Sequence, residues 1–471
     1  MGNHRQRGLD VNLNLNVRGM TPSATVAINE RCDALIREGR PVYKLGLGQS
    51  PFPVPDPVVE ELRAHAFQKD YLPVKGLWRL RRAVADYHRR TNGLTSTWQD
   101  VLIGPGSKEL MFLLQLVYYG DLVIPRPSWV SYAPQARIIG RQVRWLDTRR
   151  ENNWRMMPAD LERLCVEDPD RPRVVIVNYP SNPTGATYST ERLRELAQVA
   201  RRFRVVLLSD EIYGELHHKG QHVSLGRYYP EGTIVSSGLS KWCGAGGWRL
   251  GTFTFPPALG WLRDAMAAVA SETFTSTSAP IQYAAVRAFQ GGTEIERYLW
   301  RSRKILGALG RWAAKRLAAA GVDVHPPAGA FYLFPDFSAF ASRLAERGIT
   351  DSRGLCERLL EDAGVALLPG SDFGRPESEL TARLAYVDFD GARALAALEA
   401  ETQAGPLDDS FLRSHCARIL EAIDRVTEWL GVERAARAAG AERGSDSQSE
   451  PSERDPAARP DDLRSRGQGR A

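Results

Sequence analysis

Short apolar runs alternate with stretches of helical spacing through the middle of the chain. Seven runs rich in β-branched and aromatic residues predict strands, at 100–104, 121–125, 142–146, 173–178, 204–210, 233–238 and 249–255. Runs such as VVIV (174–177) and VVLL (205–208) are continuously apolar, as in strands that are buried on both faces. The pattern predicts an α/β fold whose mainly parallel sheet is covered by helices and binds its ligand at the carboxyl ends of the strands.

Helical spacing dominates the two ends of the chain. Residues 21–39, 56–68, 76–90, 293–320, 352–364 and 408–431 each predict one helix, and 331–337 and 383–389 resemble strands. The long helix at 293–320 is predicted to lead into a second, smaller domain. That domain would be α+β and would combine both ends of the chain.

A length of 471 residues favours two domains over one core. We expect a flexible arm at 1–20, a large domain at 61–300, and a smaller domain formed by 21–60 and 301–436. Residues 437–471 form a predicted disordered tail, because from about position 440 the only large apolar residue is Leu463.

Composition restricts the class of protein. Hydrophobic residues make up 43% and charged residues 25%, as in globular proteins, and a net charge of +6 is too small to indicate nucleic-acid binding. Five scattered cysteines without CxxC spacing argue against zinc and against a disulfide framework, so no metal site is predicted. With no apolar run near ~20 residues and no signal peptide, we expect a cytoplasmic protein without a membrane partner.

The segment SGLSKWCGAGGWR (237–249) carries the clearest chemistry. Lys241 stands between two hydroxyls, Ser237 and Ser240, and a nearby guanidinium, Arg249. A lysine among cations and away from water has a lowered pKa and can form a Schiff base, while serine and arginine bind phosphate. Pyridoxal 5′-phosphate (PLP) requires this combination.

The segment 237–249, together with NYPSNPTG (178–185) and SDEIYGEL (209–216), resembles the class I/II aminotransferases of PLP fold type I. The three segments follow one another along this chain in the same order as in that family. PSATVAIN (22–29), YLPVKG (71–76), GSKEL (106–110) and PSWVSY (127–132) are most similar to the aspartate aminotransferase-like branch. The resemblance covers about residues 21–431 and implies a large domain with a seven-stranded sheet and a ping-pong transamination.

The resemblance also implies roles in cofactor binding. Asp210 would pair with the pyridine nitrogen, Tyr213 and Asn182 would hydrogen-bond the 3′-oxygen, and Trp129 would stack on the ring. The phosphate would be held by Gly106, Ser107, Ser237, Ser240 and Arg249. Lys241 would carry the cofactor and then move a proton between the substrate Cα and the cofactor C4′.

Substrate recognition is implied in the same way. Arg383 resembles the arginine that clamps the α-carboxylate, and Asn182 and the backbone of Gly48 lie in its vicinity in the family; here GQSPF (48–52) replaces the usual GxPDF pattern. Lys108 matches a lysine associated with a distal carboxylate, which favours aspartate, glutamate or another dicarboxylate such as prephenate, with 2-oxoglutarate as acceptor. Aromatic donors remain open because Tyr132, Trp129 and Phe331 are expected near the same pocket.

Tyr71 resembles a tyrosine that reaches the cofactor phosphate of a neighbouring subunit, which implies a homodimer with shared active sites. Simpler interpretations stay open: Tyr71 as a packed aromatic residue, Arg383 on the surface of an edge strand, and Lys108 as a solvated charge. A PLP-dependent lyase, an aminocyclopropane carboxylate synthase-like enzyme and a non-catalytic PLP-binding regulator remain the alternative functions.

Overall fold

A seven-stranded sheet forms the centre of the computed structural model, which describes residues 12–400, 405 and 407–431. The strands run in the order β2 (Val101–Gly104), β8 (Gly251–Thr254), β7 (Thr233–Gly238), β6 (Val206–Asp210), β5 (Arg173–Asn178), β3 (Asp121–Arg126) and β4 (Val143–Asp147). Strand β8 alone runs antiparallel to the other strands of this sheet. The predicted α/β fold with a mainly parallel sheet is confirmed.

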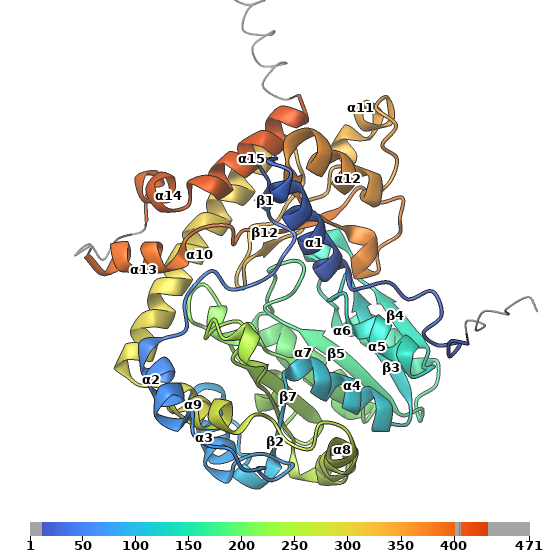
Figure 1. Cartoon of the computed structure of the whole chain (residues 1–471). Helices are drawn as coiled ribbons and strands as arrows, with labels where there is room; N and C mark the ends of the chain where they lie inside the picture. Colours follow the sequence, from blue (N-terminus) through green and yellow to red (C-terminus); the bar gives the residue numbers. More distant parts are fainter. Residues whose placement is uncertain (1–11, 401–404, 406, 432–471) are drawn as a thin grey trace, which may run out of the picture. The chain divides into compact units, whose positions relative to one another are not determined.

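Helices pack on both faces of the sheet (Figure 1). One face is covered by α4 (Ser107–Val117), α5 (Tyr132–Ile138) and α8 (Gly260–Glu272), and the other by α6 (Pro158–Val166) and α7 (Thr190–Arg202). Along β5, Val174 and Ile176 belong to the first core, whereas Val175 and Val177 belong to the second. Because successive strand residues point to opposite faces, burial of both faces requires the continuous apolar runs seen in the sequence.

Three further helices pack together beside β2: α2 (Asp56–His65), α3 (Trp78–Asn92) and α9 (Ala279–Gln290). The long helix α10 (Thr293–Ala319) then leads from this region towards a smaller part that combines both ends of the chain (Figure 1). No helix of the described ranges is both long enough and apolar enough to cross a membrane.

The smaller part contains two short sheets. Strand β1 (Tyr43–Lys44) pairs in parallel with β10 (Val365–Ala366), and β12 (Ala382–Ala385) lies between β11 (Leu368–Pro369) and β9 (Tyr332–Leu333). Its helices are α1 (Ala24–Arg37), α11 (Ala341–Ala345), α12 (Ser352–Ala363), α13 (Gly391–Ala400), α14 (Asp409–His415) and α15 (Ala417–Trp429). Early and late segments of the chain thus lie together, while the exact domain boundaries stay a prediction.

One prediction about the ends of the chain is wrong, and two others are not tested by the structure. The single helix expected at 408–431 is divided at Cys416, whose backbone leaves the helical region at φ −127° and ψ 21°. Within the predicted arm, the carbonyl of Arg18 accepts a hydrogen bond of 2.8 Å from Arg137, and the flexibility of the arm stays a prediction. Residues 1–11 and the predicted disordered tail lie outside the described residues.

Candidate active site

A cavity of about 360 Å³ lies at the carboxyl ends of β5 and β6, where the sequence placed the ligand site. It is lined by Ser107, Lys108, Trp129, Asn178, Asn182, Asp210, Ile212, Tyr213, Ser240, Lys241 and Arg249. Most of the predicted site residues therefore meet at one place, although they come from segments that are distant in the sequence.

Lys241 projects from the loop that follows β7. Its Nζ donates a 2.7 Å hydrogen bond to the carbonyl of Gly48 and lies 5.7 Å from the ring centre of Tyr213. Burial, together with the positive charges of Arg383 and Arg249, lowers the pKa of this amine from 10.5 to about 8. A substantial fraction of the amine is therefore neutral and nucleophilic just above neutral pH, which suits a Schiff-base lysine.

Asp210, the last residue of β6, is a buried carboxylate held by two hydroxyl groups. Tyr132 donates to one of its oxygens at 2.5 Å, and Ser236 donates to the other at 3.2 Å. Burial raises the pKa of Asp210 to about 6, although both hydrogen bonds act to lower it. A cationic nitrogen in the cavity would stabilise the ionised form, so this carboxylate fits a protonated pyridine.

Tyr132 does not line the cavity, contrary to the expectation from the sequence. It is buried behind Asp210, and its ring packs edge-on against Trp129 with the ring centres 5.3 Å apart. Trp129 does line the cavity.

The start of α4 provides the anion-binding end of the site. Gly106 is the N-cap residue and has φ 92°, and a Cβ there would lie 2.1 Å from Nη2 of Arg249. Arg249 itself has φ 53° and an exposed guanidinium. Free helix N-terminal amides, the hydroxyls of Ser107 and Ser240, and this guanidinium form a donor set suited to a phosphate. Ser237 is buried at the end of β7 and does not line the cavity.

Arg383 lies on β12, the central strand of the three-stranded sheet, and its side chain is fully buried. Its Nη1 donates to Oδ1 of Asn182 at 3.2 Å, and Nη2 donates to the carbonyl of Gly46. The alternative of a surface arginine on an edge strand is therefore wrong. Within the described chain its Nε has no hydrogen-bond partner. Arg383 is not among the residues that line the cavity, so its role in substrate binding stays a prediction.

Lys108 occupies the boundary between this cavity and a larger cleft of about 990 Å³. The start of α1 borders the same cleft through Pro22, Ser23 and Ala24. The Nζ of Lys108 lies 5.2 Å from the ring centre of Trp129, and the residue is exposed. The interpretation as a solvated charge thus stays open alongside that of a substrate ligand.

Tyr71 is not brought to the cavity. The residue is 89% exposed, so the alternative of a packed aromatic residue is wrong for a single chain.

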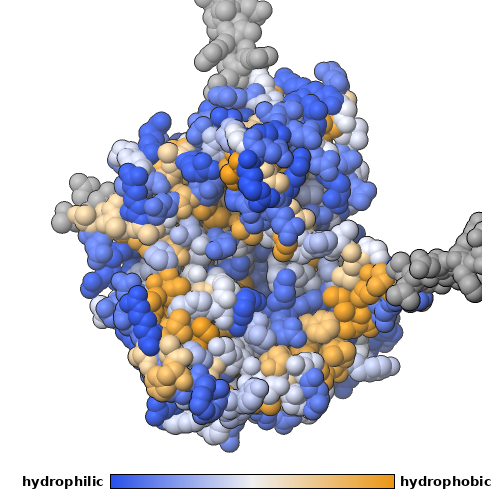
Figure 2. All heavy atoms as spheres, in the orientation of Figure 1, coloured by the Kyte–Doolittle hydropathy of each residue, from blue (hydrophilic) through white to orange (hydrophobic). Residues whose placement is uncertain are grey.

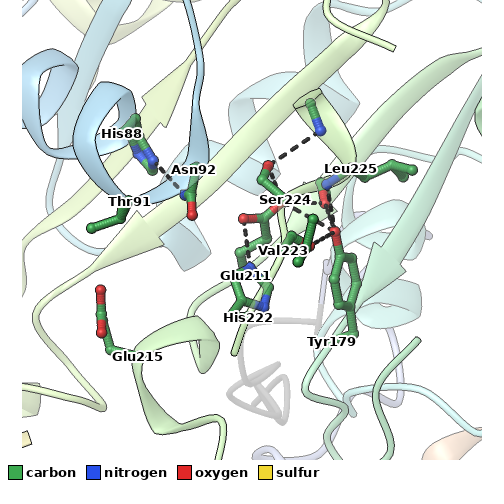
Figure 3. Close-up of polar contacts among 12 residues, drawn as sticks. His88, Thr91, Asn92, Tyr179, Glu211, Glu215, His222, Val223, Ser224 and Leu225 are labelled. Carbon is green, nitrogen blue, oxygen red and sulfur yellow. Dashed lines mark hydrogen bonds and ion pairs between the residues drawn. The ribbon is translucent and has the colours of Figure 1, made fainter. Parts of the chain in front are cut away.

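Glu211 belongs to a buried polar network that the sequence motif did not reveal (Figure 3). It accepts hydrogen bonds of 2.7 Å from Ser209 and from Ser224, and His222 Nε2 lies 2.8 Å from its second oxygen. Burial raises the pKa of Glu211, but His222 and the hydroxyls outweigh that effect and lower it. The network holds the 211–225 segment, and with it Tyr213, against β6. The only sequence signal is the adjacency of two carboxylates at a strand end.

Residues 40–388 match the family described as "Aminotransferase class I and II". The chain belongs to this family. The aminotransferase is 35% identical, over 372 residues, to the aspartate/prephenate aminotransferase of Thermus thermophilus. The aligned residues cover 77% of this chain and 91% of that protein. It is 33% identical, over 393 residues, to the aspartate aminotransferase of Geobacillus stearothermophilus, with 81% and 95% covered.

The solved structures agree with this assignment. Aspartate aminotransferase from Thermus thermophilus with maleate is 31% identical, with a TM-score of 0.75, and 89% of this chain and 100% of that chain are covered. The aminotransferase is thus a PLP-dependent enzyme of fold type I that transfers an amino group from an amino acid to a 2-oxo acid. The buried Asp210, the lowered pKa of Lys241 and the anion-binding start of α4 fit this cofactor.

Proposed function

We propose that this aminotransferase acts on acidic L-amino acids, with aspartate or glutamate as donor and 2-oxoglutarate as an acceptor. The position of Lys108 carries the proposal, because its ammonium group stands where the cavity meets the cleft bordered by α1. A carboxylate on the substrate side chain would find this cation there, while the α-carboxylate binds elsewhere. The names of two relatives, an aspartate/prephenate aminotransferase and an aspartate aminotransferase, support aspartate as a donor.

In this proposal Arg383 binds the substrate α-carboxylate. Its guanidinium is positioned by Asn182 and by the carbonyl of Gly46, and a fixed, planar fork is the geometry that a carboxylate matches with two hydrogen bonds. The backbone of Gly48 borders the same end of the site through its contact with Lys241.

PLP, when bound, supplies an electron sink for the negative charge that develops at the substrate Cα. Lys241 would hold the cofactor through its amine, and the free amine would be the group that moves a proton at the substrate Cα. Asp210 would hold a protonated pyridine nitrogen, and Tyr132 and Ser236 orient this carboxylate through their hydrogen bonds.

The remaining residues of the site orient and anchor the cofactor. Tyr213 and Asn182 would hydrogen-bond its 3′-oxygen, and Trp129 would pack against its ring, since all three residues line the cavity. The phosphate would be bound by Gly106, Ser107, Ser240 and Arg249, whereas Ser237, which does not line the cavity, would not contact it directly.

We further propose a homodimer in which Tyr71 of one subunit completes the phosphate site of the other. Exposed apolar side chains gather near Tyr71 in the sequence and along α8: Phe67, Trp78 and Trp261 are 74%, 53% and 58% exposed. The ion pair of 2.6 Å between Lys75 and Asp264 joins the two segments, and Figure 2 shows hydrophobic side chains over the region of α2 and α9. Apolar surface of this kind favours association.

All five cysteines are free, which suits a reducing cytoplasm.

The visible absorption spectrum of the cofactor-loaded protein tests the proposed donors. L-Aspartate or L-glutamate should bleach the cofactor band, and 2-oxoglutarate should restore it. Lys108→Gln should lower kcat/KM for aspartate by about tenfold and leave that for phenylalanine unchanged, because only aspartate carries a distal carboxylate. Lys219→Gln is the matched control, since Lys219 is an exposed lysine outside the cavity. A band that responds to phenylalanine but to neither acid would contradict the proposal.

A further inference from the structure

Tyr332 is a buried tyrosine that stands behind the cavity without lining it. It lies on β9, which pairs antiparallel with β12, so that Tyr332 opposes Ala385 and Leu333 opposes Leu384. The residue is fully buried. Burial of a tyrosine hydroxyl lowers the stability of the fold unless the hydroxyl is hydrogen-bonded, so a buried hydroxyl is expected to have a partner.

The hydroxyl of Tyr332 lies 2.7 Å from the hydroxyl of Tyr213, and either oxygen can be the donor. The two rings meet edge to face with their centres 5.6 Å apart. Among the described residues, Tyr213 is the hydrogen-bond partner of the Tyr332 hydroxyl. The two phenols therefore form a hydrogen-bonded pair, and Tyr213 is the member of this pair that lines the cavity.

The ring of Tyr332 has a separate contact with Arg383. The guanidinium carbon lies 4.9 Å from the ring centre, within the range of a cation–π interaction, and both side chains are fully buried. The hydroxyl also packs against the backbone of Gly48, where a Cβ would lie 2.1 Å from the oxygen. One side chain thus contacts three residues to which we assign cofactor or substrate binding.

We propose that Tyr332 is a positioning residue: its hydroxyl donates to Tyr213, so that Tyr213 donates to the cofactor 3′-oxygen, and its ring holds Arg383 for the substrate carboxylate. This inference rests on the proposed roles of Tyr213 and Arg383. A phenol has a single donor and can accept as well, so Tyr213 can serve the cofactor and Tyr332 together only if it accepts from Tyr332. A phenol that accepts a hydrogen bond is also polarised and becomes a stronger donor.

Loss of the Tyr332 hydroxyl should therefore weaken the hydrogen bond from Tyr213. The 3′-oxygen would then hold more negative charge and retain the proton that it shares with the Lys241 nitrogen to a higher pH. In Tyr332→Phe, the pH midpoint of the visible band of the cofactor-loaded protein should rise by about half a pH unit. Tyr213→Phe should raise this midpoint further.

The double variant separates a positioning role from a merely structural one. In the Tyr213→Phe background, Tyr332→Phe should leave the midpoint unchanged, because the proposed effect passes through Tyr213. Tyr386→Phe is the matched control: Tyr386 is equally buried, and its hydroxyl lies 3.5 Å from the carbonyl of Ala330. It should titrate like the wild type.

The ring is tested by binding of succinate, a dicarboxylate that does not react. Tyr332→Phe retains the ring and should bind succinate as the wild type does, whereas Tyr332→Leu should bind it roughly fivefold more weakly. The proposal is overturned if Tyr332→Phe leaves the midpoint unchanged, shifts it equally when Tyr213 is Phe, or no longer takes up the cofactor. Absence of any band from the wild type would instead refute the proposed function itself.

Discussion

Without the cofactor, the amine of Lys241 is mostly protonated at neutral pH, although burial and nearby cations disfavour its positive charge. Burial and the cations Arg383 and Arg249 lower the pKa of this amine from 10.5 to about 8 in the folded protein. The unfolded chain therefore binds the proton more tightly than the folded one. At neutral pH the charged amine reduces the free energy of unfolding of the cofactor-free protein.

Lys241→Met should consequently stabilise the cofactor-free protein at neutral pH while it abolishes transamination. We expect a gain of roughly 1–2 kcal/mol, less than the full pKa shift implies because the side chain is only half-buried. As the pH rises from about 8 towards 10.5, the unfolding free energy of the wild type should increase and the difference should shrink. Urea unfolding at a series of pH values measures this. Lys241→Arg keeps the charge and should show no gain; equal stability of all three proteins would contradict the argument.

Sequence motifs predicted the residues that line the cavity far better than those that support them. Asp210, Asn182 and Lys241 stand in short segments whose spacing indicates their chemistry. The hydroxyl that holds Asp210 comes from Tyr132, 78 positions away, and the phenol that contacts Tyr213 comes from Tyr332, 119 positions away. No local pattern encodes such pairs, because they exist only once the sheets have assembled.

At the scale of single elements, the start of α4 depends on Gly106. Gly106→Ala should weaken cofactor binding by tenfold or more, because the new Cβ would displace the Arg249 guanidinium from the phosphate end of the site. Gly93, the C-cap of α3, is the control: it also has a positive φ, but its Cβ would approach Arg227 only to 3.9 Å. Both variants should lose about 1 kcal/mol of stability through backbone strain. Calorimetric titration with PLP measures the affinity, and equal losses would contradict the argument.

Elements were predictable where burial leaves a periodic signal. All seven strands of the large sheet were found: inner strands such as β5 and β6 are buried on both faces and form continuous apolar runs, whereas the edge strand β4 is only partly buried. The break between α14 and α15 was missed because Leu412, Ile419 and Ile423 keep helical spacing across Cys416. Side-chain periodicity reports which face is buried and does not register a local change in the backbone.

At the scale of the whole molecule, the exposed Tyr71 leads to a test of shared active sites. Tyr71→Ala alone should require about tenfold more cofactor, and Lys241→Ala alone should be inactive. In a mixed dimer of the two variants, one site combines the unchanged Lys241 of one subunit with the unchanged Tyr71 of the other. This dimer should therefore show about half of the wild-type activity at limiting cofactor. Refolding of mixed variants, followed by an activity assay, measures this. Activity no higher than that of Tyr71→Ala would show that each chain forms its own site.

The pairing of β1 with β10 has a consequence for how the protein is made. Tyr43 and Val365 are neighbours in the fold, yet most of the chain separates them along the sequence. During synthesis, β1 leaves the ribosome long before its partner exists, so it must wait unpaired while the large sheet folds behind it. The helix before it also exposes Val26 and Ile36 in the finished structure. Until β10 has been made, a nascent chain would therefore expose apolar side chains of α1 and β1, which makes this segment the place where we expect chaperones to bind first.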